Sequence, residues 1–450
     1  MHAYLDASPP TYNGSLDRLD KSVFQKSFTV LAARVPSSKA GQLLKAPSLK
    51  RALMDLPKIR SVVSDPENPN GNRLILLRMS RPADIPTAAT EYLNREAHGI
   101  VDFRIDLDYD YWTTDDIIQR ILPDELRECA PSGFAMTGHI AHVNLLDEYL
   151  PYKHLIGQLI LDKNKKVRTV VNKLNTIDNQ FRVFKMEVLA GEPDFIVDHH
   201  ESDCRFTFDF SQVYWNSRLH TEHERLVRMF KPDNVVADVF AGVGPFAVPA
   251  ARKGCAVLAN DLNPASHTFL EKNVHDNRVT DLVRTFCEDG RDFIRTIAKR
   301  VHDNPLPPFT GPPLSRTQQD KEKRRARALQ QPAEALSKAD LKQRNRIDHF
   351  VMNLPDTAIL FLCAFRGILA PDESHDLITT YNVMPMVHCH CFTRELDPQK
   401  AEADIRQRVE EQLGSPLEKD VSLHLVRSVA PNKEMYCISF RLPRAVGFDK

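Results

Sequence analysis

The sequence predicts an α/β protein whose C-terminal half folds as a Rossmann-like, doubly wound domain around a parallel sheet. From about residue 206 onward, short apolar runs alternate with segments of helical periodicity, which is typical of βαβ units. The first of these runs, residues 235–239 (VVADV), is followed at once by Gly242 and Gly244. Glycines at this place let the backbone turn sharply against a ligand, and Pro245 marks the expected start of a helix.

Three further apolar runs predict the next strands of the same sheet. Residues 256–261 (AVLAND) end in Asp261, residues 282–287 (LVRTFC) precede Asp289 and Gly290, and residues 347–352 (IDHFVM) precede Asn353 and Pro355. Because ligands of such sheets bind beyond the carboxyl ends of the strands, we expect these side chains to share one site. Asp261 is placed to bind ribose hydroxyls, and Asp289 is placed to hold an adenine edge.

The length of 450 residues exceeds the usual size of one domain, and we expect three parts. Residues 1–115 predict a small N-terminal module, residues 116–205 an α+β middle domain, and residues 206–450 the Rossmann-like domain. Within the middle domain, residues 135–140 and 167–171 each predict a strand. Residues 163–168 (KNKKVR) predict a basic hairpin turn, which either contacts phosphate or is simply solvated.

One segment interrupts the alternation of strands and helices. Residues 303–346 are rich in proline, carry the basic run KEKRRAR at 321–327, and offer few large apolar side chains. Such a segment cannot bury enough apolar surface to order itself, so we expect a flexible insertion between the third and fourth strands. The basic run is either a solvated charged helix, which we favour, or a contact for RNA phosphates.

Charge, cysteine content and hydropathy limit the partners and the cell compartment that we expect for this protein. The net charge is zero, with 60 basic and 60 acidic residues, so any polyanion has to be met by local basic patches. Eight scattered cysteines are typical of reduced thiols in an intracellular protein. No apolar run is long enough to span a bilayer, and residues 1–20 resemble neither a signal peptide nor an Arg-rich transit peptide. We therefore expect a cytoplasmic or nuclear protein without a membrane partner.

The glycine turn, the two acidic strand ends and the terminal Asn-x-Pro together resemble class I methyltransferases that use S-adenosyl-L-methionine (AdoMet). Further motifs narrow this resemblance, namely residues 181–192 (FRVFKMEVLAGE), 214–225 (YWNSRLHTEHER), 353–355 (NLP) and 429–437 (VAPNKEMYC). With them, residues from about 130 to 445 resemble the eukaryotic and archaeal tRNA (guanine-37 N1)-methyltransferases. The N-terminal module fits this family only by position and size, and the proline-rich insertion departs from the compact archaeal pattern.

The resemblance implies an enzyme with AdoMet as its cofactor and a tRNA bearing guanine at position 37 as its partner. The methyl group goes to N1 of that guanine, immediately 3′ of the anticodon, after the base is turned out of its stack. This modification supports reading-frame maintenance. The resemblance also implies that the N-terminal domain checks the shape of the tRNA and that the middle domain holds the anticodon region. We expect a monomer, and the mitochondrial matrix is a further candidate location because eukaryotic family members also serve mitochondria.

The chemistry implied by the resemblance needs two side chains. Guanine N1 carries a proton, so the reaction requires a base for that proton and a donor for the negative charge that shifts to O6. The resemblance assigns the base to Glu222, in the motif Arg218-x-x-x-Glu222, and the O6 donor to Arg182. Apart from the resemblance, Glu222 could be an i,i+4 partner of Arg218 on an exposed helix, and Arg182 could be a surface residue of a strand.

The remaining substrate contacts come from three residues besides Arg218. The amide of Asn353 can both donate to and accept from a base edge, and Pro355 shapes a rigid turn against the ring; an ordinary strand-ending turn is the alternative for both. Tyr214 could stack on the extruded guanine or pack in the core, and the sequence does not decide between these. We expect Asn353 to be a catalytic residue as well as a contact to the base.

The AdoMet site is expected to draw on every strand end. Its predicted members are His223, Asp238, Gly242, Gly244, Asp261, Leu262, Asp289, Gly290 and Asn353. His223 belongs to this set by resemblance alone, since a histidine on a charged helix is otherwise unremarkable.

No metal is expected. Residues 388–391 (HCHC) suggest metal ligands, but alternation on a strand places like side chains on one face, and no second His/Cys pair lies at ligand spacing nearby. His199 and His200 have no companion motif and are expected in a loop.

Two other functions are compatible with parts of the sequence. A related enzyme of the wyosine pathway transfers the aminocarboxypropyl group of AdoMet to tRNA, but the intact motif from Arg218 to Glu222 and residues 353–355 favour methylation. A tRNA-binding protein whose catalytic function has decayed is disfavoured by the complete set of strand-end residues.

Overall fold

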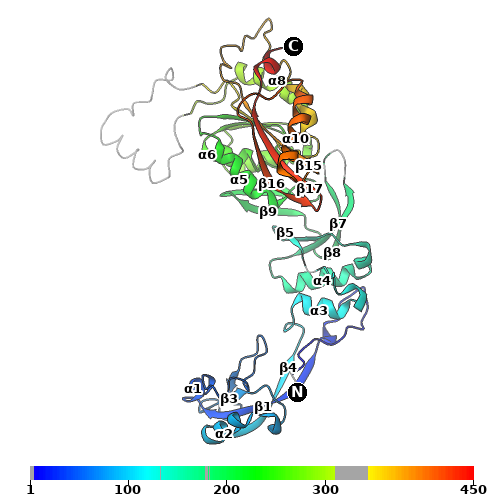
Figure 1. Ribbon diagram of the computed structural model, residues 1–450, viewed down its shortest axis with the longest axis vertical. Helices are drawn as coiled ribbons and strands as arrows, with labels where there is room; N and C mark the ends of the chain where they lie inside the picture. Colours follow the sequence, from blue (N-terminus) through cyan, green and yellow to red (C-terminus); the bar gives the residue numbers. More distant parts are fainter. Residues whose placement is uncertain (1–4, 132, 178–180, 182, 310–342, 450) are drawn as a thin grey trace, which may run out of the picture. The chain divides into compact units, whose positions relative to one another are not determined.

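The computed structural model describes all residues except 1–4, 132, 178–180, 182, 310–342 and 450. The chain divides into two compact units (Figure 1). The N-terminal unit comprises Met1–Ala135, Ile140–Lys173 and Glu187–Pro193, and the C-terminal unit comprises Met136–His139, Leu174–Met186 and Asp194–Lys450. The finer division into three domains stays a prediction.

The N-terminal unit begins with a four-stranded antiparallel sheet in the order β2-β3-β1-β4. Its elements are η1 (Lys21–Val23), β1 (Lys26–Pro36), α1 (Ala40–Leu44), β2 (Val62–Ser64), β3 (Asn72–Leu76), η2 (Pro82–Asp84), α2 (Thr87–Glu96) and β4 (Gly99–Leu107). Alternate residues of β1, Leu31, Ala33 and Val35, pack in one core with Leu43 of α1 and Leu93 of α2. The helices thus cover one face of this sheet, and the intervening residues Val30 and Ala32, which face the other way, are buried as well.

A second four-stranded sheet follows, in the order β5-β6-β7-β8, in which β6 and β7 run parallel. The elements of this region are α3 (Thr114–Ile121), η3 (Asp124–Leu126), β5 (Ala135–Thr137), β6 (Ile140–Val143), η4 (Asp147–Tyr152), α4 (Lys153–Lys163), β7 (Thr169–Ile177) and β8 (Phe184–Gly191).

The strand predicted near residues 135–140 is present as β5 (Ala135–Thr137), which stops at Gly138, where the chain turns with a φ of 55°, and Ile140 begins β6. The hairpin turn predicted for this region is wrong. Residues 163–168 do not form a hairpin turn, because they connect helix α4 to strand β7. Lys163 itself donates to the backbone oxygen of Tyr109 and lies 4.0 Å from the centroid of that ring, so its ammonium has a structural partner.

The C-terminal unit is built on a seven-stranded sheet in the order β13-β12-β11-β14-β15-β17-β16. Neighbouring strands from β13 to β15 run parallel, whereas β17 pairs antiparallel with both β15 and β16. The strands are β11 (Val235–Asp238), β12 (Ala256–Asn260), β13 (Val283–Phe286), β14 (His349–Met352), β15 (Met386–Thr393), β16 (Ser422–Ala430) and β17 (Lys433–Arg441). The four strands predicted from the sequence are confirmed, and so is the Rossmann-like class.

Helices and a small strand pair complete this unit. They are β9 (Ile196–Glu201), β10 (Cys204–Asp209), η5 (Ser217–Leu219), α5 (His220–Met229), α6 (Ala247–Lys253), α7 (Pro264–Asp276), α8 (Gly290–Asp303), η6 (Ala358–Phe365), α10 (Pro398–Leu413) and α11 (Arg444–Phe448). His199 and His200 lie in β9 rather than in a loop, so that expectation is wrong. Helix α6 begins at Ala247, two residues later than Pro245 suggested, because the turn that holds Gly242 and Gly244 extends to Phe246.

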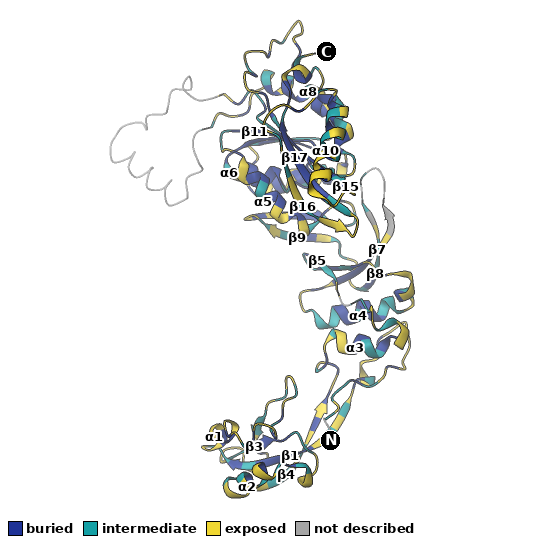
Figure 2. Cartoon of the chain, in the orientation of Figure 1, coloured by how far each residue is buried: buried dark blue, intermediate teal, exposed yellow. Residues whose placement is uncertain are grey.

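The central parallel strands β11 and β12 of the large sheet are buried on both faces. Val235 and Ala237 of β11 join a core with Phe293 of α8 and Ile405 of α10. The alternate residue Val236 is buried as well, as expected for a parallel sheet covered by helices on both sides. Figure 2 shows the buried strands, with exposed residues on the outer sides of α6 and α10. Among the residues that the structure describes, no helix is long and apolar enough to cross a membrane.

The two ends of the predicted insertion are anchored at the sheet. Residues 310–342 lie outside the described residues, but Leu306 before them pairs with Arg344 after them. Arg344 is 2% exposed and donates to the backbone oxygens of Pro232 and Gly254, at 2.7 and 2.6 Å. These oxygens belong to the segments that lead into β11 and β12, so Arg344 ties the insertion boundary to the start of the sheet.

We expect Arg344→Met to destabilise the full-length protein by about 2–3 kcal/mol, because it leaves two buried carbonyl groups without a donor. Calorimetric unfolding of the full chain measures this loss. Arg228→Met is the matched control, since Arg228 is an exposed residue paired with Glu224 on the same helix and should cost about 0.5 kcal/mol or less. Equal unfolding midpoints for the two variants would contradict the anchoring role.

Candidate active site

The turn after β11 is held open by the acidic side chain that directly follows β12. Gly242 has a φ angle of 54° and Gly244 has one of 98°. The angle at Gly244 is free of strain only for glycine. Asp261 accepts the backbone N–H of Gly242 at 2.8 Å and that of Asn263 at 2.9 Å. A side chain at Gly242 would meet no atom within 4 Å, so the turn presents an open face beyond the carboxyl end of β11.

Three acceptor oxygens of two side chains at this edge of the sheet are buried without a hydrogen-bond partner. They are both carboxyl oxygens of Asp238, at the end of β11, and the amide oxygen of Asn353, just after β14. β11 and β14 are neighbours, with Asp238 opposite Val351. Burial, and then the charge of Asp261, raise the pKa of Asp238 to about 8. Buried acceptors are normally satisfied, so a ligand with N–H donors or positive charge fits here.

The expected adenine side is formed by the start of α8. Asp289 caps this helix by accepting the backbone N–H of Arg291 at 2.7 Å. A side chain added at Gly290 would come within 2.9 Å of the ring of Phe240 and 3.2 Å of Val239, so the helix start lies tightly against the first turn. Leu262 is 41% exposed and offers an apolar surface beside Asp261. These neighbours suit a flat ring next to a ribose.

Glu222 lies in the first turn of α5 and is only 2% exposed. Arg225 donates to both of its oxygens, at 2.6 and 2.7 Å, and Nε2 of His390 donates to one of them at 2.7 Å. Although burial alone would raise it, the hydrogen bonds from Arg225 and His390 lower the pKa of Glu222 to about 2. The alternative of an exposed pair with Arg218 is wrong; the role of Glu222 as base stays a prediction.

His223, the next residue, links α5 to the glycine turn. Its Nδ1 is 2.6 Å from the carboxylate of Glu201 on β9, and its ring lies 4.7 Å from that of Phe246. Although burial alone would raise it, hydrogen bonds from His199 and His223 lower the pKa of Glu201 to about 2. The Phe246 ring also lies 6.0 Å from His390, so it packs between the cofactor turn and the partner of Glu222.

The residues predicted to contact the substrate differ in how far they are exposed. Tyr214 is 44% exposed, so the alternative that it packs in the core is wrong, while stacking on a base stays a prediction. Arg218 is exposed on η5. Pro355 is partly buried and accepts the backbone N–H of Phe392 on β15 at 3.0 Å, which fixes residues 353–355 against the sheet. Arg182 lies outside the described residues.

Two residues of the site were missed by sequence reasoning. Arg225 stands three residues after Glu222, and its spacing alone could have suggested an ion pair. His390 lies 168 residues from Glu222 in the chain, and only the pairing of β15 with β14 and β17 brings it there. The HCHC pattern drew attention to it, but as a metal ligand.

Among the described residues one group has the composition of a metal site, with ligand atoms of Glu222, His390 and Cys437 within 4.8 Å of one another. The guanidinium of Arg225 already occupies both Glu222 oxygens, and a cation placed beside it would be repelled. The arrangement is therefore better described as an ion-pair cluster.

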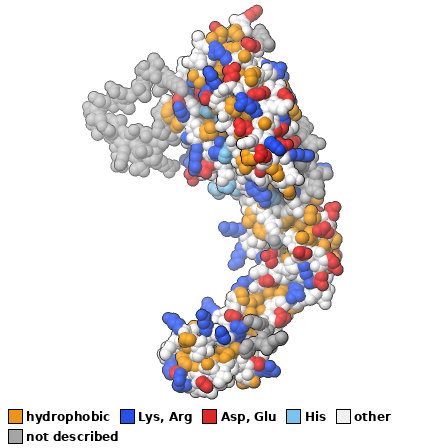
Figure 3. All heavy atoms as spheres, in the orientation of Figure 1, with side chains coloured by type: hydrophobic (Ala, Val, Ile, Leu, Met, Phe, Trp, Pro, Cys, Tyr) orange, Lys and Arg blue, Asp and Glu red, His pale blue; other side chains and the backbone are white. Residues whose placement is uncertain are grey.

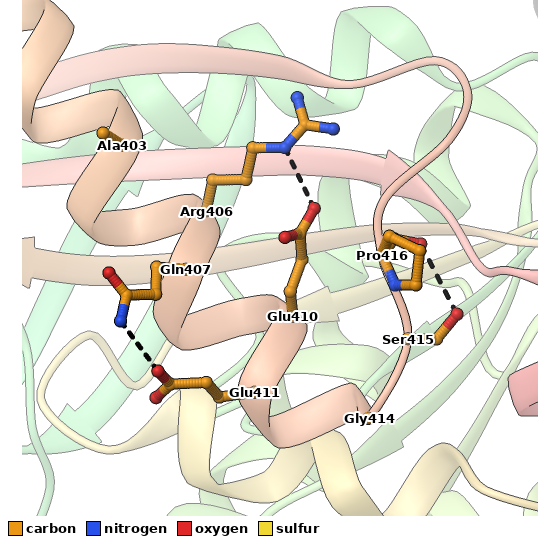
Figure 4. Close-up of a pocket in the computed structure, with 8 residues that line it drawn as sticks. All are labelled: Ala403, Arg406, Gln407, Glu410, Glu411, Gly414, Ser415 and Pro416. Carbon is orange, nitrogen blue, oxygen red and sulfur yellow. Dashed lines mark hydrogen bonds and ion pairs between the residues drawn. The ribbon is translucent and has the colours of Figure 1, made fainter.

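Among the described residues, further surface hollows lie elsewhere on this unit, and two of them are lined largely by polar side chains. One is lined by residues of β9 and of the segment from η5 to α5, namely His199, His200, Glu201, Ser202, Ser217, His220 and Glu224, and Figure 3 shows histidine side chains on the surface of the C-terminal unit. The other follows the end of α10, where Arg406 pairs with Glu410 and Gln407 with Glu411 (Figure 4). Its polar groups bind one another, so it offers no chemistry of its own.

We expect Asp238→Asn to stabilise the ligand-free protein as pH rises. The folded carboxyl group has a pKa near 8, and the unfolded one has the ordinary value of 3.8. The folded state therefore holds a proton that the unfolded chain has lost, and wild-type stability falls as pH rises between these values. The variant should lack this fall and unfold about 3 °C or more above wild type at about pH 8.

Calorimetry of the ligand-free protein across this pH range measures the effect. Asp281→Asn is the control, because Asp281 is an exposed acid in the same unit. Parallel pH dependence in wild type and Asp238→Asn would contradict the raised pKa.

Comparisons with known proteins identify the relatives of this chain. A family model described as "TYW2 N-terminal domain" matches residues 114–194, and one described as "TRM5/TYW2 methyltransferase domain" matches residues 197–305. The tRNA (guanine(37)-N(1))-methyltransferase of Coprinopsis cinerea is 60% identical, over 100% of this chain and 99% of that protein. The protein of the same name from Schizosaccharomyces pombe is 43% identical, over 97% of this chain and 96% of its own.

Solved structures share the fold. Trm5b from Pyrococcus abyssi is 24% identical with a TM-score of 0.57, covering 92% of this chain and 99% of its own. The aTrm5 chain solved in complex with tRNALeu is 19% identical with a TM-score of 0.60, covering 92% of this chain and 100% of its own. With a relative at 60% identity over its full length, the chain belongs to the tRNA (guanine(37)-N(1))-methyltransferase family.

Proposed function

We propose that this chain transfers the methyl group of AdoMet to N1 of guanine 37 in tRNA. The observation that carries the proposal is the edge of the seven-stranded sheet where Asp238, Asp261 and Asn353 follow neighbouring strands. The full-length relatives that bear this activity in their names support the same reaction. The transfer of an aminocarboxypropyl group is not favoured, because these relatives are named for methylation at guanine N1.

The residues at the sheet edge fit AdoMet by the chemistry of their free groups. Asp238 and the amide oxygen of Asn353 are buried acceptors that await donors, and AdoMet carries amino groups, ribose hydroxyls and a positive charge. We infer that Asp261 and Leu262 lie along the ribose and that Asp289 and Gly290 lie along the adenine. The open face of the turn at Gly242 leaves room for the backbone to approach the bound cofactor.

AdoMet supplies an electrophilic methyl group bound to a positively charged sulfur. The protein has to remove the proton from guanine N1 and stabilise the charge that moves to O6. We propose that Glu222 accepts the proton. A carboxylate can accept about four hydrogen bonds, and Arg225 and His390 supply three, so one position remains for guanine N1–H. Arg182 is proposed as the O6 donor, and Asn353 and Tyr214 as contacts to the base.

We expect Glu222→Gln to lower the single-turnover rate of methylation by about 100-fold or more, because an amide cannot take the N1 proton. Nucleoside mass spectrometry after incubation with AdoMet and unmodified tRNA bearing guanine 37 measures the product, and calorimetry checks that AdoMet still binds. The control is Glu224→Gln, an exposed neighbour on the same helix face as Arg228.

Three outcomes distinguish the possibilities. One methyl group at N1, absent from tRNA with adenine at position 37, supports the proposal. An aminocarboxypropyl adduct would move the chain to the wyosine pathway. Wild-type methylation by Glu222→Gln would remove Glu222 from the role of base and leave the rest of the assignment standing.

We also infer that one chain suffices for the reaction. The described residues proposed for the cofactor and the base all belong to the C-terminal unit of a single chain. Light scattering of the protein alone and with tRNA should give the mass of one chain, with or without one tRNA. A stable dimer that loses activity on dilution would contradict this.

A further inference from the structure

The environment of Glu222 raises a difficulty for its role as a base. A carboxylate whose pKa lies near 2 is reliably ionised, but it attracts a proton only weakly. A carboxyl group buried without partners would have the opposite defect, because it would be protonated at neutral pH and could accept nothing. The partners of Glu222 therefore decide whether it can work at all.

His390 is the partner that comes from outside α5. It lies in β15, is fully buried, and is paired in register with Cys437 of β17. Its Nε2 donates to Glu222, while its Nδ1 has no hydrogen-bond partner. The neighbouring Phe246 ring, 6.0 Å away at an angle of 41°, packs beside the imidazole. The ring is thus held by β15 and Phe246 beside the Cys437 sulfur, and its Nε2 hydrogen bond goes to Glu222.

The charged and titratable groups around this pair come from six elements. They are Arg225 on α5, His223 on α5 with its partner Glu201 on β9, Asp238 at the end of β11, His388 on β15, His424 on β16 and Cys437 on β17. Although burial alone would lower it, the Cys437 sulfur and then Glu222 raise the pKa of His390 to about 10. His390 is therefore held in its charged form beside the carboxylate.

We propose that His390 is a positioning residue for methyl transfer, whose Nε2–H holds the Glu222 carboxylate ionised and in one orientation inside the protein. The inference rests on the proposed role of Glu222. Arg225 shares the same helix as Glu222 and moves with it, whereas His390 ties the carboxylate to the sheet whose edge carries Asp238 and Asn353. His390 thereby fixes the distance between the base and the cofactor side of the site.

The test compares His390→Leu with His390→Gln in the full-length protein. Leucine removes the donor and keeps the volume apolar, whereas the glutamine amide can replace Nε2–H but cannot carry the histidine charge. His388→Gln is the control, because His388 is an equally buried histidine on the same strand whose partners are Ser439 and His349 rather than Glu222. Single-turnover methylation is measured between about pH 5 and about pH 8, with AdoMet and tRNA binding measured separately.

We expect His390→Leu to lower the rate constant at about pH 7 by about tenfold or more, with both dissociation constants within about twofold of wild type. The ratio of its rate constant to that of wild type should fall further toward pH 5, because Glu222 without this donor has a higher pKa and protonates within the range. His390→Gln should recover most of the rate at neutral pH, and His388→Gln should follow the wild-type profile.

The results separate this inference from the proposed function. A wild-type pH profile in His390→Leu overturns the positioning role, as does an equal loss in the leucine and glutamine variants. If His390→Leu does not fold, the glutamine variant decides alone, since a loss of tenfold there overturns the role and retention of the rate supports it. If wild type makes no N1-methylguanosine, or if Glu222→Gln stays active, the failure lies in the proposed function and not with His390.

Discussion

The burial of acidic side chains at the carboxyl edge of the seven-stranded sheet is the constraint on which the C-terminal unit depends. Taking a carboxylate out of water costs several kcal/mol unless partners replace the lost hydration. The unit meets this cost in two ways and leaves it unmet for one acid. Glu222 has side-chain cations, Asp261 has backbone N–H groups, and Asp238 has neither. The protein itself supplies hydrogen-bond partners to Glu222 and Asp261, whereas Asp238 needs a ligand to supply them.

This gradation connects the architecture to the chemistry. Parallel strands bring their carboxyl ends to one edge, so the acids at the ends of β11 and β12 lie close together. The charge of Asp261 therefore raises the pKa of Asp238 further than burial alone. Strain of this kind persists only where the surrounding structure is firmly packed. The central strands β11 and β12 supply that packing, because they are buried on both faces, and Glu222 on α5 has its own counter-charge, Arg225.

Much of this could be read from the sequence, because local patterns encode it. Strand runs, the Gly242–Gly244 turn and the acids at strand ends are features of short segments, and all four predicted strands are present. What failed depended on tertiary context. The basic residues 163–168 carry the same composition in a hairpin or after a helix. The exposure of Tyr214, which the sequence left open, likewise depends on elements distant in the chain. The pairing of Glu222 with His390 could not be predicted, since no local pattern specifies a contact across 168 residues.

The hydrogen bonds of Arg344 have a consequence for where the length of this protein chain can change. Because Leu306 pairs with Arg344, and Arg344 binds the segments that lead into β11 and β12, a change of chain length between these two residues need not alter the sheet. Lengthening the chain between two residues that are already joined costs little, about 0.6 kcal/mol for each doubling of the length between them. Insertions and deletions should therefore accumulate here between species without harm to the fold. The same boundary is a natural point at which to graft a reporter domain onto the enzyme.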